Sequence, residues 1–154
     1  MRWWRIFHIF CTVCLGIVCA QNIFRATRSL DDLASFTGQL SSVRVAYGIS
    51  RSKYVIFCFC SPPVALGLYL GVSTQEAQQL ATQVQEGDTL TIRYDAAGTL
   101  FHQEPNTLAY QVDIVGKRTI YSLAQMHHRY RLQAALYGLV MLVFVASTPV
   151  RGRK

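Results

Sequence analysis

The sequence has few charged residues. They make up 15% of its 154 positions, and only eight of them are Asp or Glu. Hydrophobic residues reach 51%, and the mean hydropathy is +0.23. Because a soluble domain carries about 25% charged residues, this composition is typical of a protein that places part of its chain in a membrane. Internal repeats, low-complexity stretches and long linkers are also missing, so the sequence predicts one ordinary folding unit beside the apolar segments.

Local catalytic motifs are missing as well. The chain has no nucleophile elbow, Gly-rich phosphate loop, metalloprotease helix or convergent acid pair. Its two tight acidic clusters are Asp31-Asp32, which follows an apolar segment, and Glu86-x-Asp88, which brackets a glycine suited to a helix end. Both are interpreted as structural. We therefore expect no enzyme activity, no catalytic residue, no cofactor and no dedicated metal site.

The formal net charge of +7 is concentrated at the chain ends. Between Arg25 and Arg131, ten Lys and Arg residues accompany all eight acids, which leaves a net charge of +2 there. The other basic residues are Arg2, Arg5, Arg151, Arg153 and Lys154. Cations beside apolar segments bind anionic headgroups. The pattern therefore predicts membrane lipid as a partner and no nucleic acid.

Both ends of the chain contain long apolar segments. Residues 132–150 carry no charge and precede a basic tail at 151–154. At a rise of about 1.5 Å per residue, these nineteen residues nearly span a bilayer core, so we predict a transmembrane helix. Residues 1–24 predict either a second transmembrane helix or a signal peptide cleaved after Val18-Cys19-Ala20. Acylation at Cys19 is a weaker alternative because bulky Val18 precedes it.

The basic residues also bear on orientation. They flank both sides of each apolar segment, with a slight excess on the terminal tails. We expect an integral protein of a bacterial inner membrane with both termini in the cytoplasm and residues 25–131 in the periplasm. Cleavage of the first segment leaves the domain in the same compartment.

Residues 25–131 carry the pattern of a small β-rich domain. Three strands are predicted first, at Gln39–Ser50, Tyr54–Cys60 and Val64–Val72. The second is short, aromatic and almost wholly apolar, which indicates a strand buried on both faces. The Ser61-Pro62-Pro63 segment ends it, because proline cannot donate to a strand ladder.

A helix follows these strands. Ser73 and Glu76 have the spacing of a capping box, and the next apolar residues recur at helical spacing. These residues are Ala77, Leu80, Ala81 and Val84. Gly87 is placed to end the helix.

Two or three further strands complete the domain. Alternating apolar residues predict strands at 90–94 and 110–114, separated by a polar loop through Pro105-Asn106, and Gly116-Lys117 predicts a tight turn into Thr119–Leu123. The order β-β-β-α-β-β is that of an OB-like barrel. The predicted fold class is therefore a membrane-anchored α+β protein, with an OB-like domain between two terminal transmembrane helices. Another small β-rich α+β domain is the alternative.

Cysteine and histidine are the residue types most suited to metal chemistry here. Cys11 and Cys14 form a C-x-x-C motif with His8 three residues earlier, and soft ligands of this kind bind copper or zinc. Within an apolar helix, small cysteines also serve as packing residues, which is the favoured interpretation. Cys58 and Cys60 lie two apart on one predicted strand and share a face. Burial is the favoured interpretation for this pair, and exposure would make it a candidate for metal transfer.

The remaining histidines have simpler interpretations. His127 and His128 diverge by about 100 degrees on a helix, so they do not chelate together. With Arg129 and Arg131 they predict an anchor at the lipid headgroups. His102 and Glu104 occupy a polar loop without a third ligand nearby, and are expected to be solvated.

Taken together, these features predict a noncatalytic, membrane-tethered interaction domain that docks onto a membrane or envelope protein. One alternative is an OB-like module that binds an oligosaccharide or a single strand across its second and third strands. That function needs exposed aromatic platforms, and the available residues are Tyr54, Phe57, Phe59 and Tyr69. Thiol-based metal handling is a further alternative.

Overall fold

The computed structural model describes residues 2–48, 51–96 and 107–147. The chain divides into two compact units. The helix unit comprises Met1–Arg28 and Ala124–Lys154, and the barrel unit comprises Ser29–Leu123. The predicted central domain covers residues 25–131, whereas the barrel unit is shorter at both ends.

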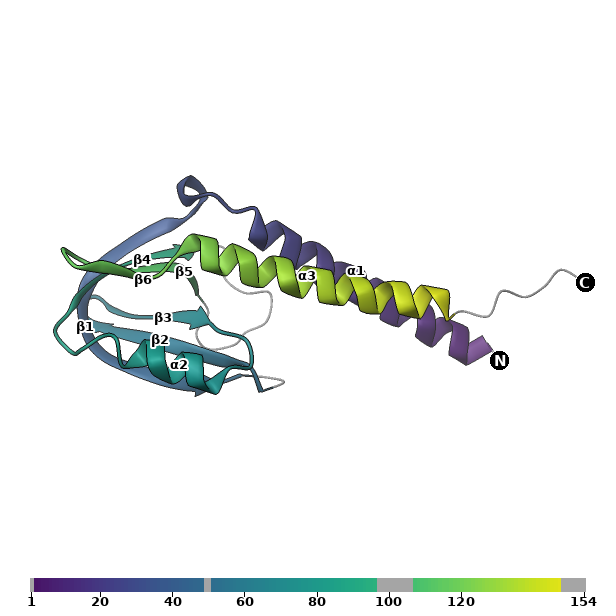
Figure 1. Ribbon diagram of the computed structural model, residues 1–154, viewed down its shortest axis with the longest axis horizontal. Helices are drawn as coiled ribbons and strands as arrows, with labels where there is room; N and C mark the ends of the chain where they lie inside the picture. Colours follow the sequence, from purple (N-terminus) through teal and green to yellow (C-terminus); the bar gives the residue numbers. More distant parts are fainter. Residues whose placement is uncertain (1, 49–50, 97–106, 148–154) are drawn as a thin grey trace, which may run out of the picture. The chain divides into compact units, whose positions relative to one another are not determined.

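The described residues of the barrel unit form six strands, one α-helix and a 3-10 turn (Figure 1). These elements are η1 (Leu30–Asp32), β1 (Ala34–Tyr47), β2 (Lys53–Cys60), β3 (Pro63–Tyr69), α2 (Thr74–Ala81), β4 (Thr89–Asp95), β5 (Leu108–Ile114) and β6 (Arg118–Tyr121). The strand order is β3-β2-β1-β4-β5-β6, and a parallel pairing of β3 with β5 closes the first five strands into a barrel. The predicted element order and the β-rich α+β class are confirmed, and the closed five-stranded barrel has the order expected of an OB-like domain.

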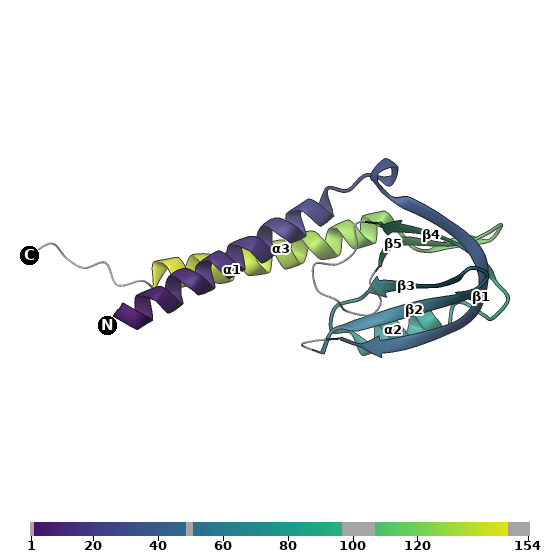
Figure 2. The same cartoon turned by 180° about the vertical axis from the view of Figure 1, so that it is seen from behind.

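The long first strand joins the two halves of the barrel. Residues 34–39 of β1 pair with β4, and residues 40–47 pair with β2, both antiparallel. The register with β2 shifts between Leu40 and Ser42, and a bulge of this kind bends a strand and increases its twist. Figures 1 and 2 show β1 curving around the barrel from one layer to the other.

Side chains that alternate along the strands fill the barrel interior. The paired residues of β2 and β3, for example Phe57 with Leu66 and Val55 with Leu68, are each at most 1% exposed. On the opposite face of β2, Tyr54 and Ile56 are also buried, but Cys58 is half-buried and Cys60 is exposed. The prediction that this strand is buried on both faces is therefore right for its first half and wrong at its end. The helix α2 packs against β1 and β2 and contributes Ala77 and Leu80 to the core.

Close packing near the bulge explains one glycine. The rings of Phe36 on β1 and Phe59 on β2 meet edge to face, with centroids 4.8 Å apart. A Cβ atom on Gly38 would lie 2.8 Å from the Phe36 ring and 3.2 Å from the Phe59 ring. Glycine is therefore the residue that lets these two aromatic rings meet inside the barrel.

Several predicted element boundaries were wrong. β1 begins at Ala34 instead of Gln39, because its early inward positions include the small residues Ala34 and Gly38, which give a weak hydrophobic alternation. β3 starts at Pro63 and ends at Tyr69, three residues before Val72. β6 spans Arg118–Tyr121 instead of Thr119–Leu123, since Leu123 already begins a helix. The predicted polar loop through Pro105-Asn106 lies outside the described residues.

The start of α2 was predicted correctly, but its end was not. Ser73 is the N-cap, and its Oγ accepts a hydrogen bond from the Glu76 backbone N–H at 3.2 Å. The helix ends at Ala81, with Thr82 as its C-cap, so Gly87 does not terminate it. Gly87 instead adopts a φ of 89° in the turn that leads into β4, a conformation that glycine tolerates best.

An ion pair fixes this turn to the barrel. Asp88 accepts hydrogen bonds from Lys117 Nζ at 2.7 Å and from the Gln85 backbone N–H at 2.8 Å. The backbone of Leu40 in β1 exchanges hydrogen bonds with Gly87 and Asp88. The hydrogen bond from Lys117, followed by the one from Gln85, lowers the pKa of Asp88 below its ordinary value of 3.8. The second acidic cluster is therefore structural at Asp88.

We expect the substitution Asp88→Asn to destabilise the barrel at neutral pH and to have little effect in acid. A carboxyl whose pKa is lowered by folding stabilises the fold above its unfolded pKa, and this contribution is lost as the pH falls through the lowered value. Urea unfolding of both proteins at neutral pH and well below pH 3.8 measures the difference. Glu86→Gln is the control, because it removes the same charge from the same turn at a side chain that is exposed. An equal effect of the two substitutions would contradict the assigned role of the ion pair.

Two long antiparallel helices form the helix unit. They are α1 (Arg2–Ala26) and α3 (Leu123–Ala146), and Figures 1 and 2 show them side by side. The ring of His8 lies 5.3 Å from that of Phe144, and Cys19 Sγ lies 3.4 Å from the Ala134 carbonyl oxygen. Both helices are long and apolar enough to cross a membrane, over Ile6–Ala26 and Leu123–Ala146.

The second helix begins nine residues before the predicted start of the 132–150 segment. Its first turns are polar, but Met126, Tyr130 and Ala134 recur at helical spacing and are buried. The buried face of α3 therefore begins before residue 132, where the uncharged segment used to predict the helix starts. Residues 148–154, with the basic tail, lie outside the described part of the chain.

Candidate functional site

The structure leaves a pair of thiols uncovered on the barrel. Cys60 is exposed and Cys58 is half-buried, so the prediction that burial conceals both was wrong. The register explains the difference. Cys58 lies between Ser42 on β1 and Ala65 on β3, and Cys60 lies opposite Pro63. These neighbours have small side chains, which cover little of the surface of Cys58 and Cys60.

Both thiols lie on the same face of β2. The pairing of β2 with β3 continues without a shift from Tyr54 through Cys60, so residues two apart point the same way. The residue between them, Phe59, points to the other face and is buried. Cys58 and Cys60 therefore form a neighbouring pair on the outside of the barrel, as the sequence predicted for a regular strand.

The aromatic residues expected to bind a ligand are mostly inside. Phe57 and Phe59 are 0% and 4% exposed, and Tyr54 is 9% exposed. Tyr69 is half-buried, and its ring packs against that of Tyr54 with the centroids 5.4 Å apart. Of the four aromatic residues predicted to stack on a ligand, only Tyr69 is therefore partly accessible.

The N-terminal thiols lie on the helix unit. Cys11 and Cys14 are half-buried, while His8 is buried and contacts the rings of Trp4 and Phe144. His8 Nδ1 is buried without a hydrogen-bond partner among the described residues. Within residues 2–48, 51–96 and 107–147, no group of three or more His, Cys, Asp or Glu side chains is placed to hold a metal ion.

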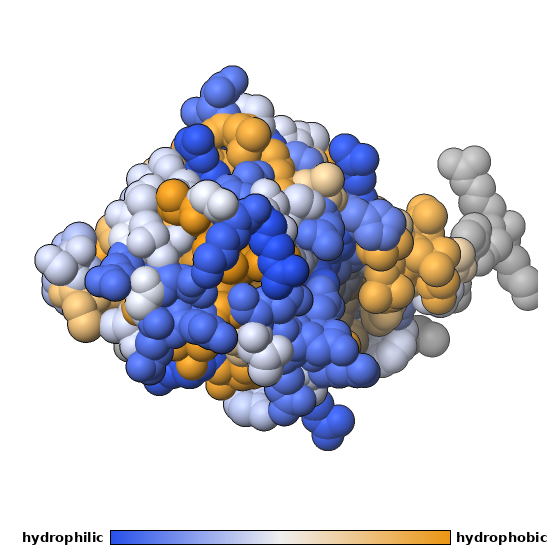
Figure 3. All heavy atoms as spheres, turned by 60° about the vertical axis from the view of Figure 1, so that its left-hand side comes forward, coloured by the Kyte–Doolittle hydropathy of each residue, from blue (hydrophilic) through white to orange (hydrophobic). Residues whose placement is uncertain are grey.

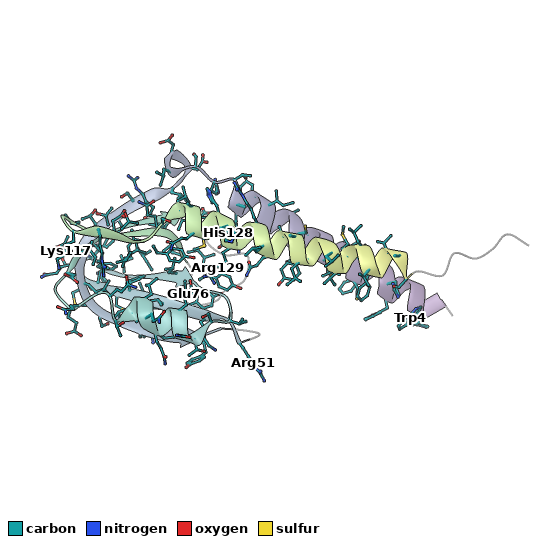
Figure 4. The ribbon with its side chains drawn as sticks, in the orientation of Figure 1. Trp4, Arg51, Glu76, Lys117, His128 and Arg129 are labelled. Atoms are coloured by element: carbon teal, nitrogen blue, oxygen red, sulfur yellow. The ribbon has the colours of Figure 1, made fainter. Side chains whose placement is uncertain are left out.

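The histidines of the second helix occupy its first turns. His127 is half-buried and His128 is exposed, and Figure 4 shows His128 and Arg129 at the start of α3. Arg25 of α1 lies over the ring of Tyr130, 5.7 Å from its centroid. The antiparallel packing therefore brings basic residues from both helices to the same end of the helix unit.

The first acidic cluster is part of a local cap. Asp32 accepts hydrogen bonds from the backbone N–H and the hydroxyl of Ser29, at 2.9 and 2.8 Å. Asp31 is exposed in the same 3-10 turn. This placement agrees with the structural interpretation of Asp31-Asp32. His102 and Glu104 lie outside the described residues.

Strand pairing also joins polar side chains of neighbouring strands into a polar outer face. Thr37 on β1 and Thr91 on β4 share a hydrogen bond of 2.9 Å between their hydroxyl oxygens. On β5, Asp113 accepts hydrogen bonds from Gln111 Nε2, at 2.8 Å, and from the hydroxyl of Thr119 on β6. These polar groups satisfy one another, and Figure 3 shows a mainly hydrophilic barrel face with scattered hydrophobic side chains.

One corner of the barrel presents apolar side chains instead. Tyr47 at the end of β1 is 70% exposed, and Val72 after β3 is 74% exposed. Lys53 joins them, because it pairs with Tyr47 in the sheet and its backbone N–H donates to the Gly71 carbonyl oxygen. Its ammonium lies 4.1 Å from the centroid of the Tyr47 ring. We call Tyr47, Val72 and exposed Arg51 the Tyr47 corner; Figure 4 shows Arg51 pointing away from the barrel.

Comparison of the chain with protein-family models, with curated proteins and with solved structures gives no match. No residue role carries over from a relative. The chemistry and exposure of the described side chains are therefore the basis of the functional proposal.

Proposed function

We propose that this protein is a noncatalytic, membrane-anchored docking module in which a helical hairpin holds the barrel at a membrane. The observation that carries the proposal is the exposed apolar surface of the helices. Only 11% of each candidate span is buried. Large apolar side chains exposed on the pair are Trp3, Trp4, Ile6, Phe7, Ile9, Phe10, Val13, Ile17, Ile23, Phe24, Leu132, Leu136, Leu139, Val140, Leu142, Val143 and Val145. Soluble monomers rarely expose so extensive an apolar surface, whereas lipid covers it.

The charge distribution supports the same proposal. All eight acidic residues lie in the barrel unit with six Lys and Arg, a net charge of −2. The helix unit carries the other nine Lys and Arg residues and no acid. Cations at the ends of membrane helices suit anionic headgroups, and a barrel with a net negative charge does not attract the phosphates of a nucleic acid. Membrane lipid is therefore the partner of the helix unit, and nucleic acid is not proposed as a partner.

The proposed location is the inner membrane of a bacterium. The terminal tails carry five basic residues, and four more lie at the barrel-proximal ends of the helices, at Arg25, Arg28, Arg129 and Arg131. Short flanks with more Lys and Arg favour the cytoplasmic side. On this basis we propose that both termini lie in the cytoplasm and the barrel in the periplasm.

The docking role depends on the Tyr47 corner. Tyrosine and arginine are enriched where proteins bind one another, and Tyr47 and Arg51 are both exposed there. The polar face around Thr37 and Asp113, in contrast, already satisfies its own hydrogen bonds. We propose a membrane or envelope protein as the partner. Burial of Tyr54, Phe57 and Phe59 disfavours the alternative of an oligosaccharide or single-strand binding module.

A photo-crosslinking amino acid at Tyr47 or at Val72 is expected to give one discrete protein adduct in native membranes. The same amino acid at Thr37 is the control, because Thr37 is exposed on the polar face of the same barrel. Gel shift and mass spectrometry identify the adducts. Substitution of Arg51 with glutamate should reduce the adduct from Tyr47, since it reverses the charge at that corner. Equal adducts from Thr37, or repeated absence of any protein adduct, would contradict the docking role.

A further inference from the structure

We propose that Cys58 and Cys60 form a two-thiolate binding site for one Cu(I) ion on the outer surface of the barrel. This inference goes beyond the docking function and does not depend on it. It depends on three features of β2: the shared face of the two residues, the exposure of Cys60 beside half-buried Cys58, and the regular backbone between them.

The spacing of the two residues suits a bridging ion better than a disulfide. Residues two apart on a strand are separated by about 6.6 Å along its axis. A disulfide requires Cβ atoms about 3.5–4.5 Å apart, which a regular strand does not provide for Cys58 and Cys60. With the metal–sulfur distance of zinc thiolates, about 2.3 Å, as a guide, two sulfur atoms on opposite sides of one ion are about 4.6 Å apart. Rotation about χ1 brings the sulfur atoms toward each other to that distance while the backbone keeps its pairing.

The number of available ligands selects the ion. Thiolates are soft ligands that bind Cu(I) and zinc. Zinc in protein sites takes four ligands, and the described residues supply no group of three or more candidate ligands. Cu(I) accepts two thiolates in a linear arrangement, so Cys58 and Cys60 suffice for it. A third ligand is absent from the described part of β2 and its neighbours, where Ser42, Ala65 and Pro63 lie opposite the thiols.

The two thiols can also be reached from outside the barrel. Ser42 and Ala65 flank Cys58 across the strands, and Cys60 is the last residue of β2, beside the exposed Ser61-Pro62 turn. An ion or a metal chaperone reaches the pair without opening the barrel. Both thiols must lose their protons to bind. Binding of one Cu(I) therefore releases two protons and changes the site from neutral to a net charge of −1.

The helix unit provides a matched control. Cys11 and Cys14 also form a pair of thiols, but they are three apart on α1 and half-buried in its apolar surface. Cys58 is half-buried as well, so the two pairs differ in the exposure of Cys60 and in backbone geometry, and not in ligand chemistry. A comparison of the two pairs thus isolates the contribution of the β2 surface.

The test uses the full-length protein, purified in detergent and kept reduced without oxygen, titrated with Cu(I) in competition with a chromogenic Cu(I) chelator. We expect one equivalent bound by the wild type and by the Cys11→Ser/Cys14→Ser variant, with X-ray absorption showing two sulfur ligands. Cys58→Ser and Cys60→Ser should each weaken binding by more than the roughly 10–100-fold that loss of a second-shell partner costs. Proton release measured in a weakly buffered solution should fall in parallel.

Two results would overturn the inference. One is Cu(I) binding that persists in the Cys58→Ser/Cys60→Ser variant or disappears in the Cys11→Ser/Cys14→Ser variant. The other is a wild-type protein whose Cys58 and Cys60 react fully with a thiol reagent and yet bind no Cu(I). Serine is nearly isosteric with cysteine, and the circular dichroism spectrum of each variant checks that the barrel is folded. The crosslinking experiment at Tyr47 is independent of these outcomes.

Discussion

Replacing Phe57 with alanine is expected to lower the free energy of unfolding of the barrel by about 3–5 kcal/mol. Phe57 lies in the middle of β2, between Val43 on β1 and Leu66 on β3, and is 0% exposed. Removal of its ring leaves a cavity that neighbours on two paired strands cannot fill without breaking their register. This is a large part of the stability of a small domain.

Chemical denaturation of the full chain in a nonionic detergent measures the effect, followed by the near-UV circular dichroism of the tyrosines. Tryptophan fluorescence is unsuitable, since Trp3 and Trp4 both lie in α1. The control is Val72→Ala, which shortens a side chain that is 74% exposed and should change stability by no more than about 0.5 kcal/mol. If Phe57→Ala and Val72→Ala lowered the free energy of unfolding equally, packing inside the barrel would not be what stabilises the domain.

Replacing Leu139 with arginine is expected to release a large fraction of the protein from the membrane. Leu139 is 60% exposed near the middle of the uncharged segment 132–150. At the centre of a membrane helix, arginine costs about 3–4 kcal/mol more than leucine on the insertion scale. Extraction of membranes with alkaline carbonate, followed by immunoblotting, gives the fraction that remains integrated.

The matched control is the same substitution at Leu132, which is 58% exposed and follows Arg131 at the start of the uncharged segment. There the arginine side chain reaches the headgroups by extending toward the interface, so integration should be nearly normal. The anchoring proposal would be wrong if alkaline carbonate extracted the wild type from the membrane. It would also be wrong if the Leu139→Arg and Leu132→Arg variants were extracted to the same extent.

Local signals in the sequence were sufficient for part of the fold. The Ser73 cap, the strand at residues 54–60 and the turn at Gly116-Lys117 were all predicted close to their observed places. Each of these signals depends on residues within about one turn or one strand of each other. Boundaries failed where small residues weakened the alternation, as at Ala34 and Gly38, or where a cap shortened a periodic stretch, as at Thr82.

The candidate site shows a sharper limit. The sequence placed Cys58 and Cys60 on one face of a strand, but it could not decide whether that face was covered. Coverage depended on the residues opposite them, Ser42, Ala65 and Pro63, which lie on other strands. The same uncertainty applied to Tyr54, whose apolar neighbours suited either a binding platform or a core.

The sequence by itself determined the apolar helices at the two ends, the order of the elements between them and the concentration of basic residues outside the acidic centre. These properties follow from composition and short-range periodicity. Only the tertiary structure decided that β3 pairs with β5 to close the barrel, that the aromatic residues of β2 face inward, and that Tyr47 and the two thiols remain outside. Burial and exposure depend on which distant strands pair and in which register, and a shift of one residue would have turned each side chain to the other face.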